Sequence, residues 1–251
     1  MADALLAIDG LSKRFGSLVV SDDIRLDVRR GEMHALIGPN GAGKTTLIHQ
    51  LSGVLESDSG RVVLDGEDIS GLDMVHRVRK GLARSFQITS ILPGYTVLEN
   101  VAVAVQARSG TSFRFLAPVA EEAALNGAAR AALARVGLER RAALRAGLLA
   151  HGEKRLLEPA MAIATAPKLL LLDEPLAGLG QEESKDCIEL LRALKSEFTI
   201  VLVEHDMDAV FSLADRVSVL VYGRVIATGT PAEIRANAEV RSAYLGNDGG
   251  V

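Results

Sequence analysis

The chain has 251 residues, of which 48% are apolar and 24% charged, and its formal net charge is −4. This length suits one large globular domain, and the acidic balance gives no global basic face of the kind that nucleic-acid partners require. A single cysteine, Cys187, excludes an intrachain disulfide, and we expect neither a signal peptide nor an apolar run of the roughly 18 residues that a membrane span needs.

Short apolar or alternating segments are separated by helical segments along most of the chain. The expected strands are LLAID, VVSDDIRLDV, MHALIG, RVVLDG, GLARSF, KLLLLD, TIVLVE, RVSVLV and RVIATG. The expected helices cover residues 43–52, 73–80, 153–166, 181–196 and 206–213. This alternation predicts one α/β domain over residues 1–251 with a mainly parallel core sheet. The part of the chain before about Asp68, outside the phosphate loop, predicts an antiparallel β subdomain. Apolar and polar residues alternate along its expected strands, and turn residues separate them.

A helical insertion is expected in the middle of the chain, over residues 88–148. Strand signals nearly disappear after Tyr95, and the segment is rich in Ala, Leu, Arg and Glu. Thr96 and Glu99 have the spacing of a capping box, so a helix should begin there.

The strongest single motif is a glycine-rich loop that follows the expected strand MHALI. It matches G-x-x-x-x-G-K-[ST] and consists of Gly38, Pro39, Asn40, Gly41, Ala42, Gly43, Lys44 and Thr45. Glycines let backbone N–H groups converge on phosphate oxygens, and the helix N-terminus that follows favours anions. Lys44 should contact the β- and γ-phosphates, and the Thr45 hydroxyl should bind Mg²⁺. The loop alone does not separate an ATPase from a GTPase or a kinase.

Polar residues also end two later apolar strands of the expected sheet. Asp173 and Glu174 follow a run of four leucines, where a parallel sheet places its ligand site. Asp173 is a candidate Mg²⁺ partner through water, and Glu174 a candidate general base, with an ordinary acidic turn as the alternative. His205, at the end of TIVLVEHD, is a candidate to hold a γ-phosphate or the attacking water. Gln87, before the insertion, is a candidate sensor of Mg²⁺ and the γ-phosphate.

The order of these motifs resembles the ATP-binding subunits of ABC transporters over nearly the whole chain. The resemblance implies a P-loop NTPase core and ATP hydrolysis with ATP and Mg²⁺. It places the segment LAHGE at the family's LSGGQ signature, which caps the γ-phosphate held by a second ATPase. This segment consists of Leu149, Ala150, His151, Gly152 and Glu153.

The same resemblance assigns roles to further positions. Phe15 matches the aromatic residue that stacks on adenine, and Thr46 belongs to the phosphate-loop motif GPNGAGKTTL. The implied catalytic residues are Glu174, His205, Lys44 and Gln87. The implied metal site comprises Thr45, Gln87 and Asp173.

Finer details are similar to the branched-chain amino acid uptake subgroup of that family. They are GPNGAGKTTL, ARSFQ, TVLENV, LLLDEPLAGL, VEHDM, ATGTPAEI and AYLG. Urea or amide uptake and lipopolysaccharide export ATPases carry similar strings, and a soluble non-transport ABC ATPase is a further alternative. A P-loop kinase or GTPase leaves LAHGE and VEHD unexplained.

The resemblance also implies partners and a location. It implies membrane permease subunits, a second ATPase copy or a sibling ATPase, and a periplasmic or extracellular substrate-binding protein. The chain would then be cytoplasmic, held on the inner face of the membrane by its permeases. We expect the permease surface around residues 87–100, where apolar residues lie next to the nucleotide sensor.

Three departures from the family pattern stand out. Ala150 lacks the serine hydroxyl of LSGGQ, and Gly180 stands where an Asp or Asn is usual. Pro159 and Met161 interrupt the usual pattern of the signature helix. Pro159 removes a backbone donor from the expected helix over 153–166, and we predict a bend there. None of the three replaces a catalytic residue, so we expect hydrolysis to survive.

Overall fold

The structure is a computed structural model that describes residues 4–84, 91–109 and 123–245. The strands are β1 (Ala4–Phe15), β2 (Leu18–Arg29), β3 (Met33–Ile37), β4 (Ser59–Leu64), β5 (Glu67–Asp68), β6 (Leu82–Arg84), β7 (Leu169–Asp173), β8 (Thr199–Val203), β9 (Arg216–Val221) and β10 (Arg224–Gly229). The α-helices are α1 (Lys44–Ser52), α2 (Met74–Lys80), α3 (Val97–Ser109), α4 (Ala123–Arg135), α5 (His151–Ala164), α6 (Gln181–Lys195), α7 (Met207–Leu213), α8 (Pro231–Ala236) and α9 (Ala238–Leu245). Across the described ranges, no helix is both long and apolar enough to cross a membrane.

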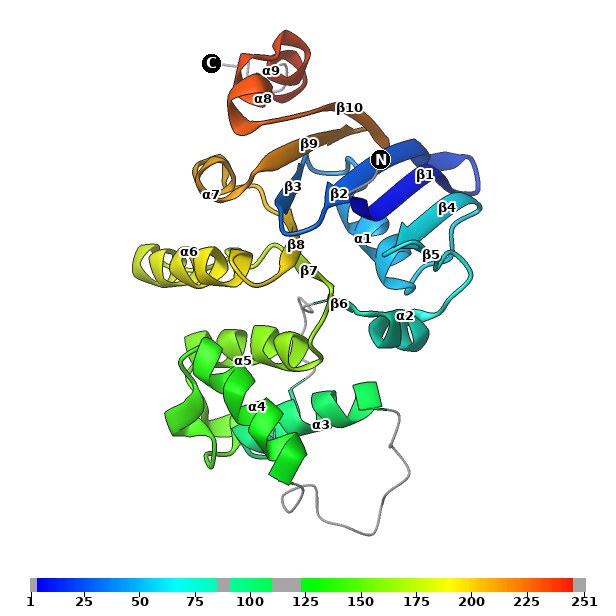
Figure 1. The fold of residues 1–251 in the computed structure, drawn as a ribbon. Coiled ribbons are helices and arrows are strands. Elements are labelled where there is room, and N and C mark those ends of the chain that lie inside the picture. The colour runs from blue at the N-terminus through cyan, green and yellow to red at the C-terminus, as the bar shows by residue number, and fades with distance from the viewer. Residues whose placement is uncertain (1–3, 85–90, 110–122, 246–251) are drawn as a thin grey trace.

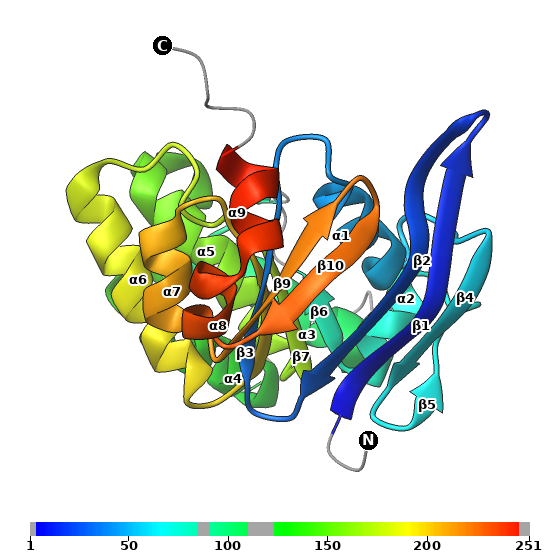
Figure 2. The ribbon, with the colours of Figure 1, turned by 90° about the horizontal axis from the view of Figure 1, so that it is seen from above.

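Two sheets form the core. The larger has the order β10-β9-β3-β8-β7-β6, and all its neighbouring pairs are parallel except β9 with β10. Every residue of β3, β7 and β8 is buried, as expected for strands covered on both faces. The smaller sheet, β2-β1-β4-β5, is antiparallel throughout and lies beside the core sheet (Figure 2). The predicted α/β core with an antiparallel N-terminal part is confirmed.

The helices α3, α4 and α5 form a separate group, drawn in green at the bottom of Figure 1. Their shared core includes the fully buried side chains of Val101, Leu133 and Leu157, one from each helix. The start of α3 has the predicted capping box. Glu99 Oε2 accepts the Thr96 N–H at 2.6 Å, and the Glu99 N–H donates to Thr96 Oγ1 at 3.1 Å. This reciprocal pair satisfies two backbone donors that a helix otherwise leaves open.

The predicted helices match α1, α2, α5, α6 and α7, whereas α8 and α9 were not predicted. α5 begins at His151, two residues before the expected start, and continues as one helix through Pro159. Proline has no N–H to donate to the Arg155 carbonyl, and the bend expected at Pro159 stays a prediction. β6 covers Leu82–Arg84 of the expected strand GLARSF, and the last two residues of that segment lie outside the described residues.

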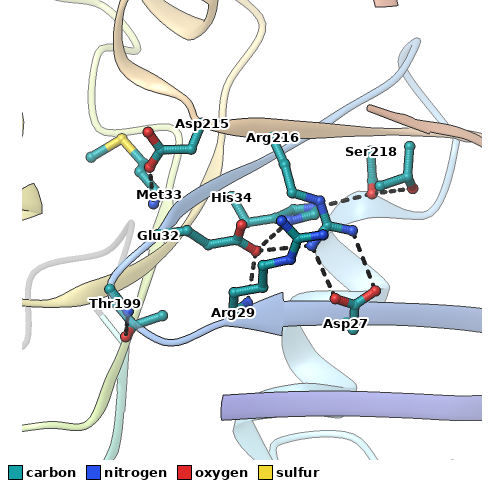
Figure 3. A network of polar contacts seen from close by, with 11 residues as sticks. Asp27, Arg29, Glu32, Met33, His34, Thr199, Asp215, Arg216 and Ser218 are labelled. Carbon is teal, nitrogen blue, oxygen red and sulfur yellow. Dashed lines mark hydrogen bonds and ion pairs between the residues drawn. The ribbon is translucent and has the colours of Figure 1, made fainter. Parts of the chain in front are cut away.

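A buried polar network joins the two sheets at the end of β3 that is opposite the phosphate loop (Figure 3). Arg216 in β9 donates to Asp27 in β2 at 2.9 Å and to Glu32 at 3.3 Å. His34 is fully buried, with Nδ1 3.1 Å from Glu32 and Nε2 2.8 Å from Ser218. Because the buried side chains of Glu32, His34 and Ser218 all have partners, and Arg216 also reaches Asp27 of β2, the network connects the antiparallel sheet to the core sheet.

Candidate active site

Four of the candidate residues, Lys44, Asp173, Glu174 and His205, lie at the carboxyl-terminal edge of the core sheet. The registers pair Leu36 with Val203, and Val203 with Asp173, so the ends of β3, β8 and β7 lie level with one another. The segments that follow these strands therefore share one edge, which is where open α/β sheets bind ligands. They are the phosphate loop, Glu174 and the Glu204–His205 pair.

The phosphate loop runs from β3 into α1, with Gly43 as the residue that precedes the helix. Gly43 has a φ of 103°, and a Cβ there would lie 2.6 Å from the Val20 carbonyl oxygen. A side chain is therefore excluded at Gly43, and the first turn of α1 has no acidic residue. These features fit a polyphosphate, since backbone N–H groups and the helix dipole both favour anions.

Lys44 holds its ammonium group inside this loop. Its Nζ donates to the Gly38 carbonyl at 2.6 Å and to the Pro39 carbonyl at 3.1 Å. Burial lowers the pKa of the ammonium, and the nearby charges of Glu174 and Asp173 act in the opposite direction. Lys44 is thus positioned at the loop, and the carboxylates of Asp173 and Glu174 lie close enough to affect its pKa.

Asp173 ends β7 and forms an ion pair that the sequence did not predict. Arg84 Nη2, from β6, donates to Asp173 Oδ2 at 3.0 Å, and both side chains are almost fully buried. The part of the chain that the structure describes holds no group of three His, Cys, Asp or Glu residues able to bind a metal. Mg²⁺ at this edge would therefore need phosphate and water oxygens beside Thr45 and Asp173, in keeping with its preference for retained waters.

Glu174 follows Asp173 with a backbone conformation that is rare for a large side chain. Its φ is 50°, in the left-handed region, and its N–H donates to the Val203 carbonyl at 2.8 Å. Its side chain is partly exposed. Such strained residues persist where surrounding structure imposes them, and they concentrate at functional sites.

Glu204 is a buried acid that connects the loop after β7 to His205. One carboxylate oxygen accepts the Leu176 N–H at 2.7 Å and the other accepts the His205 N–H at 3.0 Å. Burial raises the pKa of Glu204. The His205 side chain is 61% exposed, with Nδ1 3.7 Å from Glu204. Glu204 therefore positions the segments that carry both Glu174 and His205, a role that sequence reasoning missed.

The LAHGE segment forms the N-terminus of α5. The Ala150 N–H donates to Glu153 Oε2 at 3.0 Å, and Arg141 Nε donates to Glu153 Oε1 at 2.8 Å. Both bonds lower the pKa of Glu153, the backbone bond more strongly. Ala150 and His151 are exposed, whereas Leu149 is buried. Within the described residues, none of the hydrogen bonds of LAHGE reaches the phosphate loop.

The two remaining candidate residues are Phe15 and Gln87. Phe15 lies at the end of β1 with 51% of its surface exposed, and Lys13 Nζ is 5.7 Å from its ring centroid. Base stacking by Phe15 stays a prediction. Gln87 lies outside the described residues, so its role as a sensor stays a prediction as well.

Replacing Ala150 with serine should stabilise the fold by about 0.5–1 kcal/mol, because Ala150 precedes α5 in an extended conformation without a side-chain acceptor. The serine hydroxyl would accept a backbone N–H of the first turn and complete the half-formed capping box with Glu153. Urea unfolding would measure the gain. The matched change Ala236→Ser, in the last turn of α8, should give no gain. Equal stability of Ala150→Ser and the parent would contradict the capping geometry.

Comparisons with known proteins agree with this geometry. The family description "ABC transporter" matches residues 21–177, and "Branched-chain amino acid ATP-binding cassette transporter" matches residues 224–249. The high-affinity branched-chain amino acid transport ATP-binding protein LivG of Salmonella typhimurium is 40% identical over 253 residues, which cover 98% of this chain and 99% of LivG. BraF of Pseudomonas aeruginosa, of the same description, is 40% identical over 254 residues with the same shares covered.

Solved structures of similar cassettes share the fold. A nucleotide-free ATP-binding cassette from an ABC transporter superimposes with a TM-score of 0.83 at 27% identity, over 96% of this chain and 98% of that one. The ADP conformation of MJ1267, an ATP-binding cassette of an ABC transporter, superimposes with a TM-score of 0.85 at 28% identity, over 97% of this chain and 99% of that one. With the phosphate loop, the strand-end carboxylates and nearly full-length relatives all in agreement, this chain belongs to the ABC transporter family of ATP-binding subunits.

Proposed function

We propose that this chain hydrolyses ATP to drive an importer of branched-chain or other amino acids. The observation that carries the proposal is the meeting of Lys44, Asp173, Glu174 and His205 at one sheet edge. LivG and BraF, which match almost end to end, support the class of substrate, as does the match of residues 224–249. Urea or amide uptake and lipopolysaccharide export are the alternatives that a transport experiment must separate.

In the proposed reaction, the loop N–H groups and the Lys44 ammonium orient the triphosphate of ATP. Glu174 accepts a proton from water as the water attacks the γ-phosphorus, the bond between that phosphorus and the β,γ-bridging oxygen breaks, and ADP is the leaving group. His205 hydrogen-bonds the γ-phosphate. Mg²⁺, held beside Thr45 and Asp173, would neutralise charge on the β- and γ-phosphate oxygens. Glu204 keeps the base and the histidine in register through its two backbone hydrogen bonds.

A complete site requires two ATPase subunits in this proposal. One chain carries both halves, the phosphate loop and LAHGE, and LAHGE presents an exposed helix N-terminus with the partly exposed Gly152 in its first turn. Two copies arranged head to tail would therefore make two equivalent sites, each capped in trans. A sibling ATPase could replace one copy, but the presence of both halves supports self-pairing.

An exposed apolar patch, formed by Leu92, Tyr95 and Leu148, supports contact with a permease. These side chains are 40%, 49% and 71% exposed. Two backbone bonds tie the patch together, since Ala146 donates to the Tyr95 carbonyl at 2.8 Å and Gly147 to the Pro93 carbonyl at 3.1 Å. Exposed apolar patches mark interaction sites, and a short cytoplasmic helix of a membrane permease fits this one. The chain would then work on the cytoplasmic face, with a substrate-binding protein on the other side.

Charged substitutions in this apolar patch should block assembly with the permeases. Leu92→Glu and Tyr95→Glu together would place two unpaired carboxylates in an interface that must exclude water. We expect co-purification with the permeases to fall at least ~10-fold while ATP binding is unchanged. Val54→Glu, at a position 52% exposed after α1, is the control and should co-purify normally. Normal assembly of the doubly charged variant would place the permease surface elsewhere.

Transport by the reconstituted system tests the proposed function itself. The chain and its permease partners would be placed in liposomes with the substrate-binding protein. The proposal expects ATP-dependent uptake of leucine, isoleucine or valine. ATP-dependent uptake of urea or amides, or extraction of lipopolysaccharide, in place of amino acid uptake would overturn the substrate assignment.

A further inference from the structure

Tyr222 is the most exposed large hydrophobic residue of the described part of the chain, and it has an unusual backbone conformation. It begins the turn between β9 and β10, with a φ of 46°, and 85% of its surface is exposed. Gly223, next in the turn, has a φ of 78°. Two positive φ values in a two-residue hairpin turn favour Asn, Asp or Gly, and a bulky residue there is an outlier.

Few other residues share this conformation. In the described residues, the non-glycine positions with positive φ are Asp23, Asp65, Ala166, Glu174 and Tyr222. Aspartate tolerates the left-handed region because its short side chain bonds locally, and alanine is small. Glu174 and Tyr222 are the large ones, and each follows a strand that ends at the carboxyl-terminal edge of the core sheet. Since such backbone strain concentrates at functional sites, the strained conformation of Tyr222 indicates a functional role, as it does for Glu174.

The turn is attached directly to the phosphate loop. The Gly223 N–H donates to the Ala42 carbonyl at 2.9 Å. A Cβ on Gly43 and a Cβ on Gly223 would each lie 2.6 Å from the same Val20 carbonyl oxygen, so both glycines pack against one point of β2. Figure 2 shows the orange β9–β10 turn beside the start of α1. Tyr222 is therefore held next to the residues that receive the phosphates.

We propose that Tyr222 binds the nucleoside of ATP, with its ring against the ribose or the adenine of the nucleotide whose phosphates the loop holds. Aromatic rings bind nucleobases by stacking with little dependence on hydrogen bonds. The exposed Tyr222 ring lies beside the phosphate loop, at a position where asparagine would be less strained. This placement fits a role in nucleoside binding. Tyr222 would contribute to ATP affinity and to nucleoside specificity, in addition to the base stacking predicted for Phe15. The inference rests on the proposed ATP binding at Lys44.

The test compares ATP with inorganic tripolyphosphate, which lacks the nucleoside, as ligands of the purified full-length chain. For Tyr222→Asn, we expect the ATP Kd to rise about tenfold and the tripolyphosphate Kd to stay unchanged. Tyr222→Phe keeps the ring and should bind ATP within about twofold of the parent. Because asparagine suits the left-handed region, the melting temperature of Tyr222→Asn should not fall.

The outcomes separate this inference from the proposed function. An unchanged ATP Kd in Tyr222→Asn, or equal weakening of ATP and tripolyphosphate, would overturn the role of the ring in nucleoside binding. Parent protein that binds neither ligand would instead overturn ATP binding at the loop, and with it the basis of this inference.

Discussion

Replacing Glu174 with glutamine should reduce ATP turnover at least ~100-fold while ATP binding remains. The amide keeps the size and most hydrogen bonds of the carboxylate but cannot accept a proton from the attacking water, and positioned general bases contribute about 10²- to 10⁴-fold. Steady-state phosphate release and equilibrium nucleotide binding would measure the two quantities separately.

The matched control is Glu182→Gln in the first turn of α6. Glu182 is 86% exposed and pairs only with Lys185 at 2.9 Å among the contacts of the described residues. Its turnover should equal that of the parent. Undiminished hydrolysis in Glu174→Gln would mean that another group accepts the proton, and the strained backbone of Glu174 would need a different explanation.

Replacing Lys44 with alanine should weaken ATP binding about 100-fold. The ammonium is directed into the loop by the Gly38 and Pro39 carbonyls, so it already occupies the side of the loop where phosphates would bind. Two hydrogen bonds from a charged donor to phosphate, each worth about 1.5 kcal/mol, account for roughly 3 kcal/mol of binding free energy. Calorimetric titration with ATP and Mg²⁺ would give the affinity.

Lys185→Ala provides the control for the loss of one positive charge. Its side chain is 69% exposed on α6 and lies outside the candidate site. ATP affinity should remain within about twofold of the parent. If Lys185→Ala and Lys44→Ala weakened binding equally, overall charge rather than the geometry of the loop would explain the affinity.

The parts predicted well from the sequence are those that depend on short-range patterns. The phosphate loop is recognisable because its glycines, Lys44 and Thr45 must stand at fixed spacing between a strand and a helix. Asp173 and Glu174 were found because a dense apolar run predicts a buried strand, and the end of a parallel strand predicts a ligand site. The capping box at Thr96 is also local, and the structure confirms it.

The parts that sequence reasoning missed depend on contacts between distant segments. Arg84 and Asp173 are 89 positions apart, and Leu176 and Glu204 are 28 apart, so no local pattern links either pair. α8 and α9 were missed because they are short and show little helical periodicity. A capping box at Thr230 and the proline at Pro231 do mark the start of α8. These two local signals are sufficient to predict the start of α8 from the sequence.

The most direct test of the account is whether ATP makes two copies of this chain pair. Glu174→Gln would be mixed with ATP and Mg²⁺ at saturating concentration, and its molar mass measured by light scattering. The account predicts a shift from 26.6 kDa to twice that mass, reversed when ATP is removed, because LAHGE of each copy caps the nucleotide of the other. A protein that binds ATP yet remains at 26.6 kDa would contradict self-pairing through LAHGE.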